Sequence, residues 1–431
     1  MRKQKKKQNF WKRDRSMAEM IELSKEIEKV ILVGVSVEEN DDTEKSLDEL
    51  EELAGTAGAV TVGRVIQKRE QIHPATYVGK GKIDEIKEML WETEATGIIC
   101  DDELSPAQLG NLQDALDTKV MDRTLIILDI FAERASTSEG KIQVELAQLK
   151  YRQSRLVGLG KSLSRLGGGI GTRGPGEKKL EMDRRLIKGR IAQLNRELKE
   201  VKRHREVTRE QRNRNHLPVV AIVGYTNAGK STLLNKLTGA SVLEEDKLFA
   251  TLDPTTRGLK LQSKQEILLT DTVGFIRKLP HHLIEAFKST LEEAKYADII
   301  LHVVDASNSQ LDEQMHIVYE TLRQLEVVNK PIITAFNKQD KADSEMIIRD
   351  FKADYIVKIS AKTGEGLENL LEIIEEVLRQ QKVMVERVYP YAEAGKIQLI
   401  RKYGELLTEE YGEEGIFVKA YVPVEIYGKI Q

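Results

Sequence analysis

The part of this sequence that most constrains its fold is an eight-residue phrase, Gly224-Tyr225-Thr226-Asn227-Ala228-Gly229-Lys230-Ser231. It fits the pattern G-x-x-x-x-G-K-S, follows the apolar run from Pro218 to Val223 and precedes a helical pattern from Thr232 to Leu237. A strand, a glycine-rich loop and a helix in this order surround phosphate oxygens with backbone N–H groups and a helix N-terminus. The phrase therefore predicts a nucleoside triphosphate site, with Lys230 near the β/γ-phosphates and Ser231 on Mg²⁺.

Two later segments bear on which base is bound. Asn337-Lys338-Gln339-Asp340 follows an apolar strand pattern, at the carboxyl end of a strand where α/β proteins bind ligands. The carboxylate of Asp340 can accept from guanine N1–H and from the exocyclic amine, whereas adenine offers neither donor there. Ser360-Ala361-Lys362, after the strand pattern Tyr355 to Ile359, would supply a backbone N–H to guanine O6. The order of these segments after the glycine-rich loop predicts GTP and GDP as ligands.

A metal site and a switch are predicted between those segments. Asp271-Thr272-Val273-Gly274 ends the strand pattern Ile267 to Thr270, so the Asp271 carboxylate can hold Mg²⁺ through water and the Gly274 N–H can approach the γ-phosphate. The segment Phe249 to Arg257 contains threonines, one of which should complete the Mg²⁺ shell only while a γ-phosphate is present. Thr251 is favoured, with Thr255 and Thr256 as alternatives.

The predicted site residues fall into three groups. The catalytic residues are Lys230, Thr251 and Gly274, and the Mg²⁺ ligands are Ser231, Thr251 and Asp271. The nucleotide-binding residues are Gly224, Tyr225, Thr226, Asn227, Ala228, Gly229, Lys230, Ser231, Thr232, Phe249, Ala250, Thr251, Leu252, Asp253, Asp271, Thr272, Val273, Gly274, Asn337, Lys338, Gln339, Asp340, Ser360, Ala361 and Lys362.

Composition limits the class of protein. The 431 residues suggest about three domains, and 67 Lys+Arg against 70 Asp+Glu give a net charge of −3. Cys100 is the single cysteine, which excludes intramolecular disulfides and a thiolate zinc site. No apolar run reaches the length of about 18 residues that a membrane span requires. We expect a soluble cytoplasmic protein without a membrane span.

The first part of the chain is predicted to be a basic tail, residues 1–28, and an α/β domain, residues 29–135. Strand patterns at 30–33, 59–66 and 97–100 alternate with helical patterns at 46–57, 83–91 and 106–116. Such alternation predicts a parallel or mixed sheet with helices on its faces. The tail, with eight Lys/Arg in residues 1–15, is interpreted as a solvated segment or, alternatively, as an arm for RNA.

Residues 136–216 are predicted to form an antiparallel helical hairpin. A helix over 141–156 is followed by a predicted loop over 157–176, which holds eight glycines, three cations (Lys161, Arg165, Arg173) and no acidic residue. A coiled-coil seam then follows the spacing of Leu180, Ile187, Ile191, Leu194, Leu198 and Val201. Residues 177–216 carry 14 Lys/Arg against seven Asp/Glu. The glycine-rich tip is either a flexible linker or a surface that contacts folded RNA through phosphates.

Strand–helix alternation resumes over the predicted GTPase domain, residues 217–381. Residues 382–431 are predicted to be a small α+β module, with a strand from Val383, a helix over 392–402 and a strand over 416–422. The predicted fold class is therefore α/β: a P-loop GTPase domain with an N-terminal α/β domain, a helical hairpin and this module.

These phrases resemble those of the HflX family within the Obg–HflX superfamily of GTPases. The resemblance rests on Gly224 to Ser231, Phe249 to Arg257, Asp271 to Phe275 and, most specifically, the phrase Gly167-Gly-Gly-Ile-Gly-Thr-Arg-Gly-Pro-Gly-Glu177. It covers residues 29–380 and implies a GTPase that binds the ribosome, chiefly the large subunit and its RNA, and dissociates ribosomes into subunits under stress. A monomer is expected. Two other functions stay open at this point: a P-loop ATPase that remodels RNA, and a nucleotide-regulated adaptor that binds ribosomes without splitting them.

Phe275 stands where many GTPases have the glutamine that orients the attacking water. A phenyl ring cannot orient water, so we expect slow hydrolysis by the isolated protein and faster turnover with its partner bound. Three further features are interpreted as structural: Tyr77 to Lys82 as too short for a second nucleotide loop, His281-His282 as a solvated turn, and Cys100 as core packing.

Overall fold

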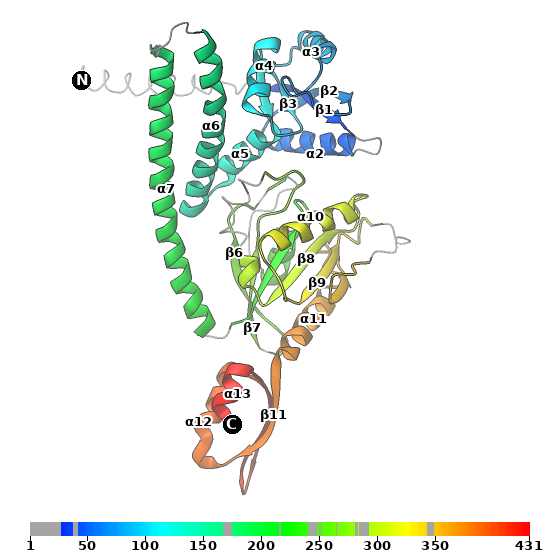
Figure 1. The fold of residues 1–431 in the computed structure, drawn as a ribbon. Helices are drawn as coiled ribbons and strands as arrows, with labels where there is room; N and C mark the ends of the chain where they lie inside the picture. Colours follow the sequence, from blue (N-terminus) through cyan, green and yellow to red (C-terminus); the bar gives the residue numbers. More distant parts are fainter. Residues whose placement is uncertain are drawn as a thin grey trace, which may run out of the picture. The chain divides into compact units, whose positions relative to one another are not determined.

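The computed structural model of the chain describes residues 27–37, 42–166, 175–214, 217–239, 248–249, 251–263, 265–280, 283, 293–342 and 349–431. It divides into two compact units, Met1–Ile127 and Leu128–Gln431, and Figure 1 shows the elements of each. Within the described residues, no helix has the length and apolar character needed to cross a membrane.

The first unit contains a parallel sheet of four strands in the order β2-β1-β3-β4. The strands are β1 (Lys29–Ser36), β2 (Val60–Lys68), β3 (Gly97–Cys100) and β4 (Lys119–Asp122), and the helices are α2 (Thr43–Thr56), α3 (Lys80–Thr93) and α4 (Pro106–Leu116). Helix α4 begins where predicted because Ser105 and Gln108 form a capping box around Pro106. Helix α5 (Arg123–Arg134) follows β4, and neither element is among those predicted from the sequence.

Helices α6 (Ser138–Leu166) and α7 (Pro175–Arg214) lie side by side (Figure 1). Their polar contacts pair Leu156 with Arg184 and Glu145 with Arg190, so residue numbers rise on one helix as they fall on the other, which establishes an antiparallel hairpin. Of the predicted seam, Leu194 is buried, and Ile187, Ile191, Leu198 and Val201 are half-buried.

The hairpin differs from the prediction at its tip. Helix α6 continues past Leu156 to Leu166, and α7 begins at Pro175, so most of the predicted loop over 157–176 is helical. Leu156, Leu159, Leu163 and Leu166 continue the helical spacing, and Gly158 and Gly160 weaken a helix by only about 1 kcal/mol each. The rest of the glycine-rich phrase, residues 167–174, the side chain of Leu180, the side chains of Lys161 and Arg165, and His281-His282 lie outside the described residues.

The second unit also contains a six-stranded sheet in the order β10-β9-β8-β5-β7-β6, parallel except for the antiparallel edge strand β6. Its strands are β5 (Val219–Gly224), β6 (Thr255–Lys260), β7 (Glu266–Asp271), β8 (Ile299–Asp305), β9 (Ile332–Asn337) and β10 (Tyr355–Lys358). Its helices include α8 (Lys230–Thr238), α10 (Leu311–Gln324) and α11 (Leu367–Gln380).

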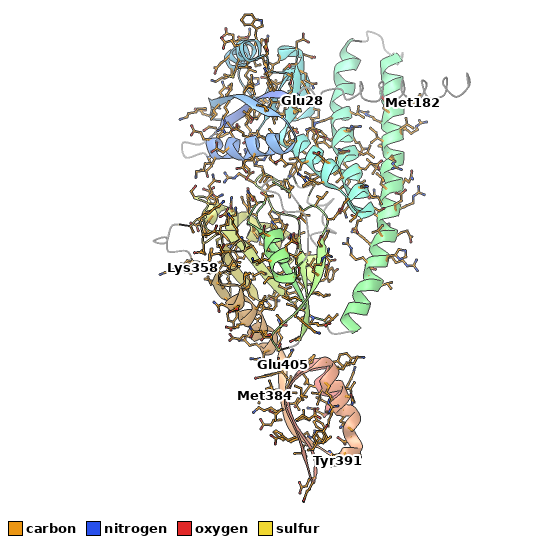
Figure 2. All side chains as sticks on the ribbon, turned by 180° about the vertical axis from the view of Figure 1, so that it is seen from behind. Glu28, Met182, Lys358, Met384, Tyr391 and Glu405 are labelled. Atoms are coloured by element: carbon orange, nitrogen blue, oxygen red, sulfur yellow. The ribbon has the colours of Figure 1, made fainter. Side chains whose placement is uncertain are left out.

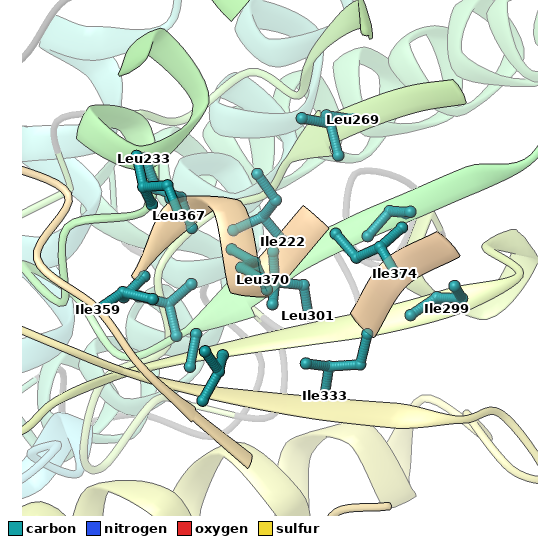
Figure 3. Close-up of a cluster of buried hydrophobic side chains, with 14 of the residues drawn as sticks. Ile222, Leu233, Leu269, Ile299, Leu301, Ile333, Ile359, Leu367, Leu370 and Ile374 are labelled. Atoms are coloured by element: carbon teal, nitrogen blue, oxygen red, sulfur yellow. The ribbon is translucent and has the colours of Figure 1, made fainter. Parts of the chain in front are cut away.

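Helices cover both faces of this sheet because its strands alternate. Val303 joins the cluster under α8 and α11, whereas its neighbour Val304 joins the cluster under α10. Figure 3 shows the first cluster, in which Leu370 and Ile374 of α11 pack with strand residues such as Ile333. This packing fixes the carboxyl ends of the strands, and therefore the loops that follow them.

The last module is an antiparallel sheet in the order β11-β13-β12 with two helices on one face. It consists of β11 (Lys382–Tyr389), a 3₁₀ turn at Tyr391–Glu393, α12 (Ala394–Tyr403), β12 (Glu405–Gly412), β13 (Gly415–Pro423) and α13 (Val424–Ile430). Met384 and Glu405 lie on its strands, and Tyr391 lies in the 3₁₀ turn (Figure 2). Glu405 accepts a hydrogen bond from Arg379 of α11 at 2.9 Å.

Candidate nucleotide-binding site

A pocket of about 400 Å³ lies where the strands β5, β7 and β9 end. All five predicted segments contribute to its wall. The lining residues are Thr226, Asn227, Gly229, Lys230, Ser231, Thr232, Phe249, Thr251, Thr272, Gly274, Asn337, Lys338, Asp340, Lys341, Ala361 and Lys362.

Two glycines permit close approach of the loops around this pocket. Gly229 has φ +92°, and a Cβ there would lie 2.3 Å from Nδ2 of Asn337. A Cβ on Gly274 would lie 2.9 Å from Cα of Thr226 and 3.0 Å from Nζ of Lys230. Only glycine fits at these two positions, so no side chain covers the backbone of either loop there.

Lys230 is 6% exposed, and its Nζ donates to the carbonyl of Tyr225 at 2.7 Å. Burial lowers the pKa of Lys230 from 10.5 to about 8, against the opposing effect of the Asp271 carboxylate. An anion bound in the pocket would favour the charged ammonium. A bound phosphate group would add negative charge to that of Asp271 and offset the cost of burying the ammonium.

Ser231 and Thr251 line the pocket, and the buried Asp271 meets them behind its wall. The Ser231 Oγ lies 2.7 Å from Thr251 Oγ1 and donates to Asp271 Oδ2 at 2.7 Å. Asp271 is fully buried, which raises the pKa of its carboxyl, while Lys230 and the two hydroxyls oppose that rise. Among the described residues, nothing hydrogen-bonds its second oxygen, Oδ1. Two hydroxyl oxygens and a carboxylate with an unpartnered oxygen are the hard donors that suit Mg²⁺.

The position of Thr251 distinguishes it from the alternatives. Thr255 and Thr256 lie in strand β6, where Thr256 Oγ1 is 3.0 Å from Thr270 Oγ1. Of the three predicted threonines, Thr251 is the one that the structure brings to Ser231.

Asn337 connects two other loops of the pocket wall through its side-chain amide. Its Nδ2 donates to the carbonyl of Ala228 at 2.9 Å, and its Oδ1 accepts from the N–H of Ala361 at 2.8 Å. The Ser360 Oγ donates to Asp340 Oδ1 at 2.7 Å, which lowers the pKa of that carboxyl. Asp340 is therefore held as an anion at the pocket wall, able to accept from paired N–H donors of a ligand.

Phe275 does not line the pocket. Its side chain is 2% exposed, and its backbone pairs with the glycine-rich loop, through Thr226 N to Phe275 O at 2.8 Å and Phe275 N to Gly224 O at 3.1 Å. The ring is a core residue, so the chain places no water-orienting group at this position.

The remaining predicted residues lie behind or beside the wall. The hydroxyl of Tyr225 accepts from the backbone of Arg277 at 2.7 Å, and Gln339 donates to the Phe336 carbonyl at 3.1 Å. Gly224, Ala228, Leu252, Val273 and Ser360 support the wall without lining it, and Ala250 lies outside the described residues. Asp253 was predicted to contact the nucleotide, but its carboxylate accepts hydrogen bonds from Ser136 and Thr137, away from the pocket lining.

Two residues of this region were not predicted. Lys341 lines the pocket directly after Asp340, and Asp305 pairs with Lys338, with 2.7 Å between Oδ2 and Nζ. Asp305 is the last residue of β8, so the rule that ligands meet the carboxyl ends of parallel strands could have found it.

Comparison with known proteins gives matches along most of the chain. Three family models match: GTP-binding GTPase N-terminal over residues 44–132, GTP-binding GTPase Middle Region over 134–212, and 50S ribosome-binding GTPase over 219–338. A GTPase HflX of Lacrimispora saccharolytica is 70% identical over 414 residues, covering 96% of this chain and 98% of the relative. A GTPase HflX of Caldanaerobacter subterraneus is 51% identical over 412 residues, covering 96% and 95%.

Among solved structures, the complex of SsGBP with GDP is 29% identical and covers 82% of this chain and 99% of its own, with a TM-score of 0.46. Family membership rests on the sequence matches.

Proposed function

Because this chain belongs to the HflX family of GTPases and is a GTP-hydrolysing enzyme, we propose that it acts with Mg²⁺ on ribosomes. In this proposal it binds the large subunit and its RNA in the cytoplasm, dissociates ribosomes into subunits under stress, and leaves after hydrolysis. The observation that supports it most is that Ser231 and Thr251 line a pocket that Asp340 also lines, and that both belong to a cluster with the buried Asp271.

Base recognition is assigned to the Asp340 end of the pocket. The carboxylate accepts from guanine N1–H and N2–H, and the N–H of Ala361 or Lys362 faces guanine O6. Because Asn337 ties this loop to Ala228, base and phosphate contacts belong to one rigid wall. A base without the two donors would leave a charged carboxylate unpaired.

The triphosphate end is assigned to Lys230, Gly274 and the metal ligands. Lys230 neutralises charge on the β/γ-phosphates, and the Gly274 N–H donates to a γ-oxygen. Ser231 and Thr251 would hold Mg²⁺ directly and Asp271 through water; the ion would neutralise the charge that develops on the phosphate oxygens. Thr251 reaches this place from a loop, so a γ-phosphate can order the loop and its loss can release it.

Hydrolysis by this chain alone is proposed to be slow. Phe275 is buried in the position from which a glutamine would orient water. The missing group is supplied when the ribosome is bound, and turnover then rises.

The hairpin is proposed as the part that enters the ribosome. Exposed cations such as Arg185, Lys188 and Arg196 lie along α7, and the sequence of the tip carries Arg165 and Arg173 without an acidic neighbour. Cations on a narrow rod favour contacts with RNA phosphates rather than reading of bases.

A sucrose-gradient profile of purified ribosomes, with the protein and each nucleotide in turn, tests this function. Splitting predicts separate subunit peaks with the imido analogue of GTP and fewer with GDP. An adaptor without splitting activity would leave whole ribosomes that carry the protein. The double variant Arg165→Glu, Arg173→Glu should weaken ribosome binding and its salt dependence while GTP affinity is unchanged; unaltered binding would exclude the tip as the contact.

A further inference from the structure

The segment that carries Thr251 also carries Asp253, and the two side chains are engaged at different places. Thr251 Oγ1 lies 2.7 Å from Ser231 Oγ at the nucleotide pocket. Two residues later, Asp253 contacts Ser136 and Thr137, the two residues that precede helix α6 of the hairpin. Each residue of extended chain spans at most about 3.6 Å. The two residues from Thr251 to Asp253 are therefore too short for one side chain to move far while the other keeps its contact.

Four hydrogen bonds fix the Asp253 carboxylate. Oδ2 accepts from Ser136 N at 2.9 Å, Ser136 Oγ at 2.7 Å and Thr137 N at 2.8 Å, and Oδ1 accepts from Thr137 Oγ1 at 2.5 Å. The same Thr137 hydroxyl accepts from the N–H of Gly140 at 2.9 Å, which caps the first turn of α6. The hydrogen bonds to the ionised Asp253 carboxylate therefore connect the N-cap of α6 to the loop that carries Thr251.

Gly140 leaves the space that this contact needs. A Cβ at this residue would lie 2.3 Å from Asp253 Oδ1 and 3.2 Å from Thr137 Oγ1. Its φ lies outside the left-handed region, so alanine would be accepted by the helix and would favour it. The glycine is therefore required by the contact with Asp253 and not by the helix backbone.

An aromatic contact joins the same segment to helix α5, which precedes Ser136 and Thr137. Phe249 and Phe131 meet edge to face with ring centroids 4.7 Å apart, and both side chains are almost fully buried. Phe249 has φ +55°, which is uncommon for a bulky residue and persists only where the surroundings enforce it. Phe249 also lines the nucleotide pocket. One end of the segment Phe249–Asp253 therefore contacts α5 through Phe131, and the other contacts Ser136 and Thr137, between α5 and α6.

We propose that Asp253 is a positioning residue that couples the nucleotide to the helical hairpin: its cap on α6 holds Thr251 at the metal site, and loss of the γ-phosphate releases both. The inference rests on the proposed roles of Thr251 and Mg²⁺. Coupling of this kind is reciprocal: a hairpin held by Asp253 strengthens triphosphate binding, and the triphosphate strengthens the cap by the same factor. Displacement of the hairpin by a ribosome would then reach the nucleotide through Asp253.

Hydrogen exchange of the full-length protein tests the coupling without ribosomes. The amides of Ser136, Thr137 and Gly140 should exchange more slowly with the imido analogue of GTP and Mg²⁺ than with GDP. In the first state Asp253 accepts from the first two amides and fixes the Thr137 hydroxyl, which accepts from the third. The variant Asp253→Asn should remove this difference. It should also lower the ratio of imido-GTP affinity to GDP affinity by about tenfold, with GDP affinity unchanged.

Two further variants separate coupling from damage to the fold. Gly140→Ala keeps the charge of Asp253 and favours the helix, yet it should lower the affinity ratio as Asp253→Asn does, and the double variant should be no worse than either alone. Asp354→Asn is the matched control, because Asp354 also accepts from a backbone N–H, that of Ile332 at 2.8 Å, in another part of the fold. It should leave both the exchange and the ratio unchanged.

Equal exchange of these amides in the two nucleotide states would overturn the coupling, provided that both nucleotides bind. So would Gly140→Ala or Asp253→Asn with an unchanged affinity ratio. Wild-type coupling without ribosome dissociation would overturn the proposed function and leave the coupling intact, so the two failures are distinguishable.

Discussion

The side-chain amide of Asn337 donates to the backbone carbonyl of Ala228 at 2.9 Å, which ties the base-side loop of the pocket to its phosphate loop. Asn337 is 2% exposed, so both atoms of this bond are removed from water. A nucleotide that contacts the two loops therefore meets them in a fixed relation.

Asn337→Ala should weaken GTP and GDP binding alike, because the bond acts on the shape of the pocket and not on the γ-phosphate. Loss of one buried amide with two partners costs about 1–3 kcal/mol, or about fivefold to 150-fold in affinity. Calorimetric titration with each nucleotide measures it. Asn308→Ala removes an amide that only caps a turn at Gln310 and serves as the control. A variant with unchanged affinities would contradict this role.

Asp340→Asn should change the preferred base. An amide offers a donor where the carboxylate only accepted, so guanine loses a partner and xanthine, which has an oxygen in place of the amine, gains one. Competition between GTP, XTP and ATP for the pocket measures the change, with Asp312→Asn on the surface of α10 as control. Retained preference for GTP, or effective competition by ATP in the wild type, would contradict the assignment of the base site.

Removal of Mg²⁺ by a chelator should weaken binding of the imido analogue of GTP much more than binding of GDP. The variant Ser231→Ala should reproduce most of that loss in the presence of Mg²⁺, since it deletes a ligand and the bond to Asp271. Titrations at several Mg²⁺ concentrations measure the dependence. The same Mg²⁺ dependence in Ser231→Ala as in wild type would argue against this metal site.

Burial of His302 should lower the free energy of unfolding at acid pH. Burial lowers the pKa of His302 from 6.5 to about 4, against the pull of Asp350, whose Oδ2 lies 3.9 Å from Nδ1. Between these pH values the unfolded chain binds a proton here that the folded chain excludes, so stability is lost as pH falls from 6.5 towards 4. The loss at this site amounts to about 3 kcal/mol.

Urea unfolding of wild type and His302→Leu at pH 6.5 and pH 4.5 measures this difference, and the variant should lose less stability than wild type. His316→Leu, at an exposed position of α10, controls for the loss of an imidazole. Equal losses in wild type and His302→Leu would show that His302 is not responsible.

Much of the pocket could be predicted because its residues follow recognisable strands. Gly224 to Ser231, Asp271 to Gly274 and Asn337 to Asp340 each come directly after an apolar run, so a parallel sheet brings them to one edge. Edge strands were harder to predict. Strand β6, Thr255–Lys260, has no buried residue, and its polar sequence lacks the alternation that indicates a strand.

The contact of Asp253 shows a second limit of the sequence. Asp253 lies 117 residues from Ser136, and nothing in either local sequence indicates the other. Its place beside Thr251 predicted a nucleotide contact, whereas the chain turns its carboxylate to the helix that starts after Thr137. Pairings of this kind depend on how packed elements meet, which periodicity and motifs do not specify.

The measurement that most directly tests the account is the rate of GTP hydrolysis by the purified protein with and without large ribosomal subunits. Since Phe275 cannot orient water, we expect slow turnover alone and a marked increase when subunits are added, lost in the Arg165→Glu, Arg173→Glu variant. The same rate in the presence and absence of subunits would contradict the claim that the ribosome completes this site.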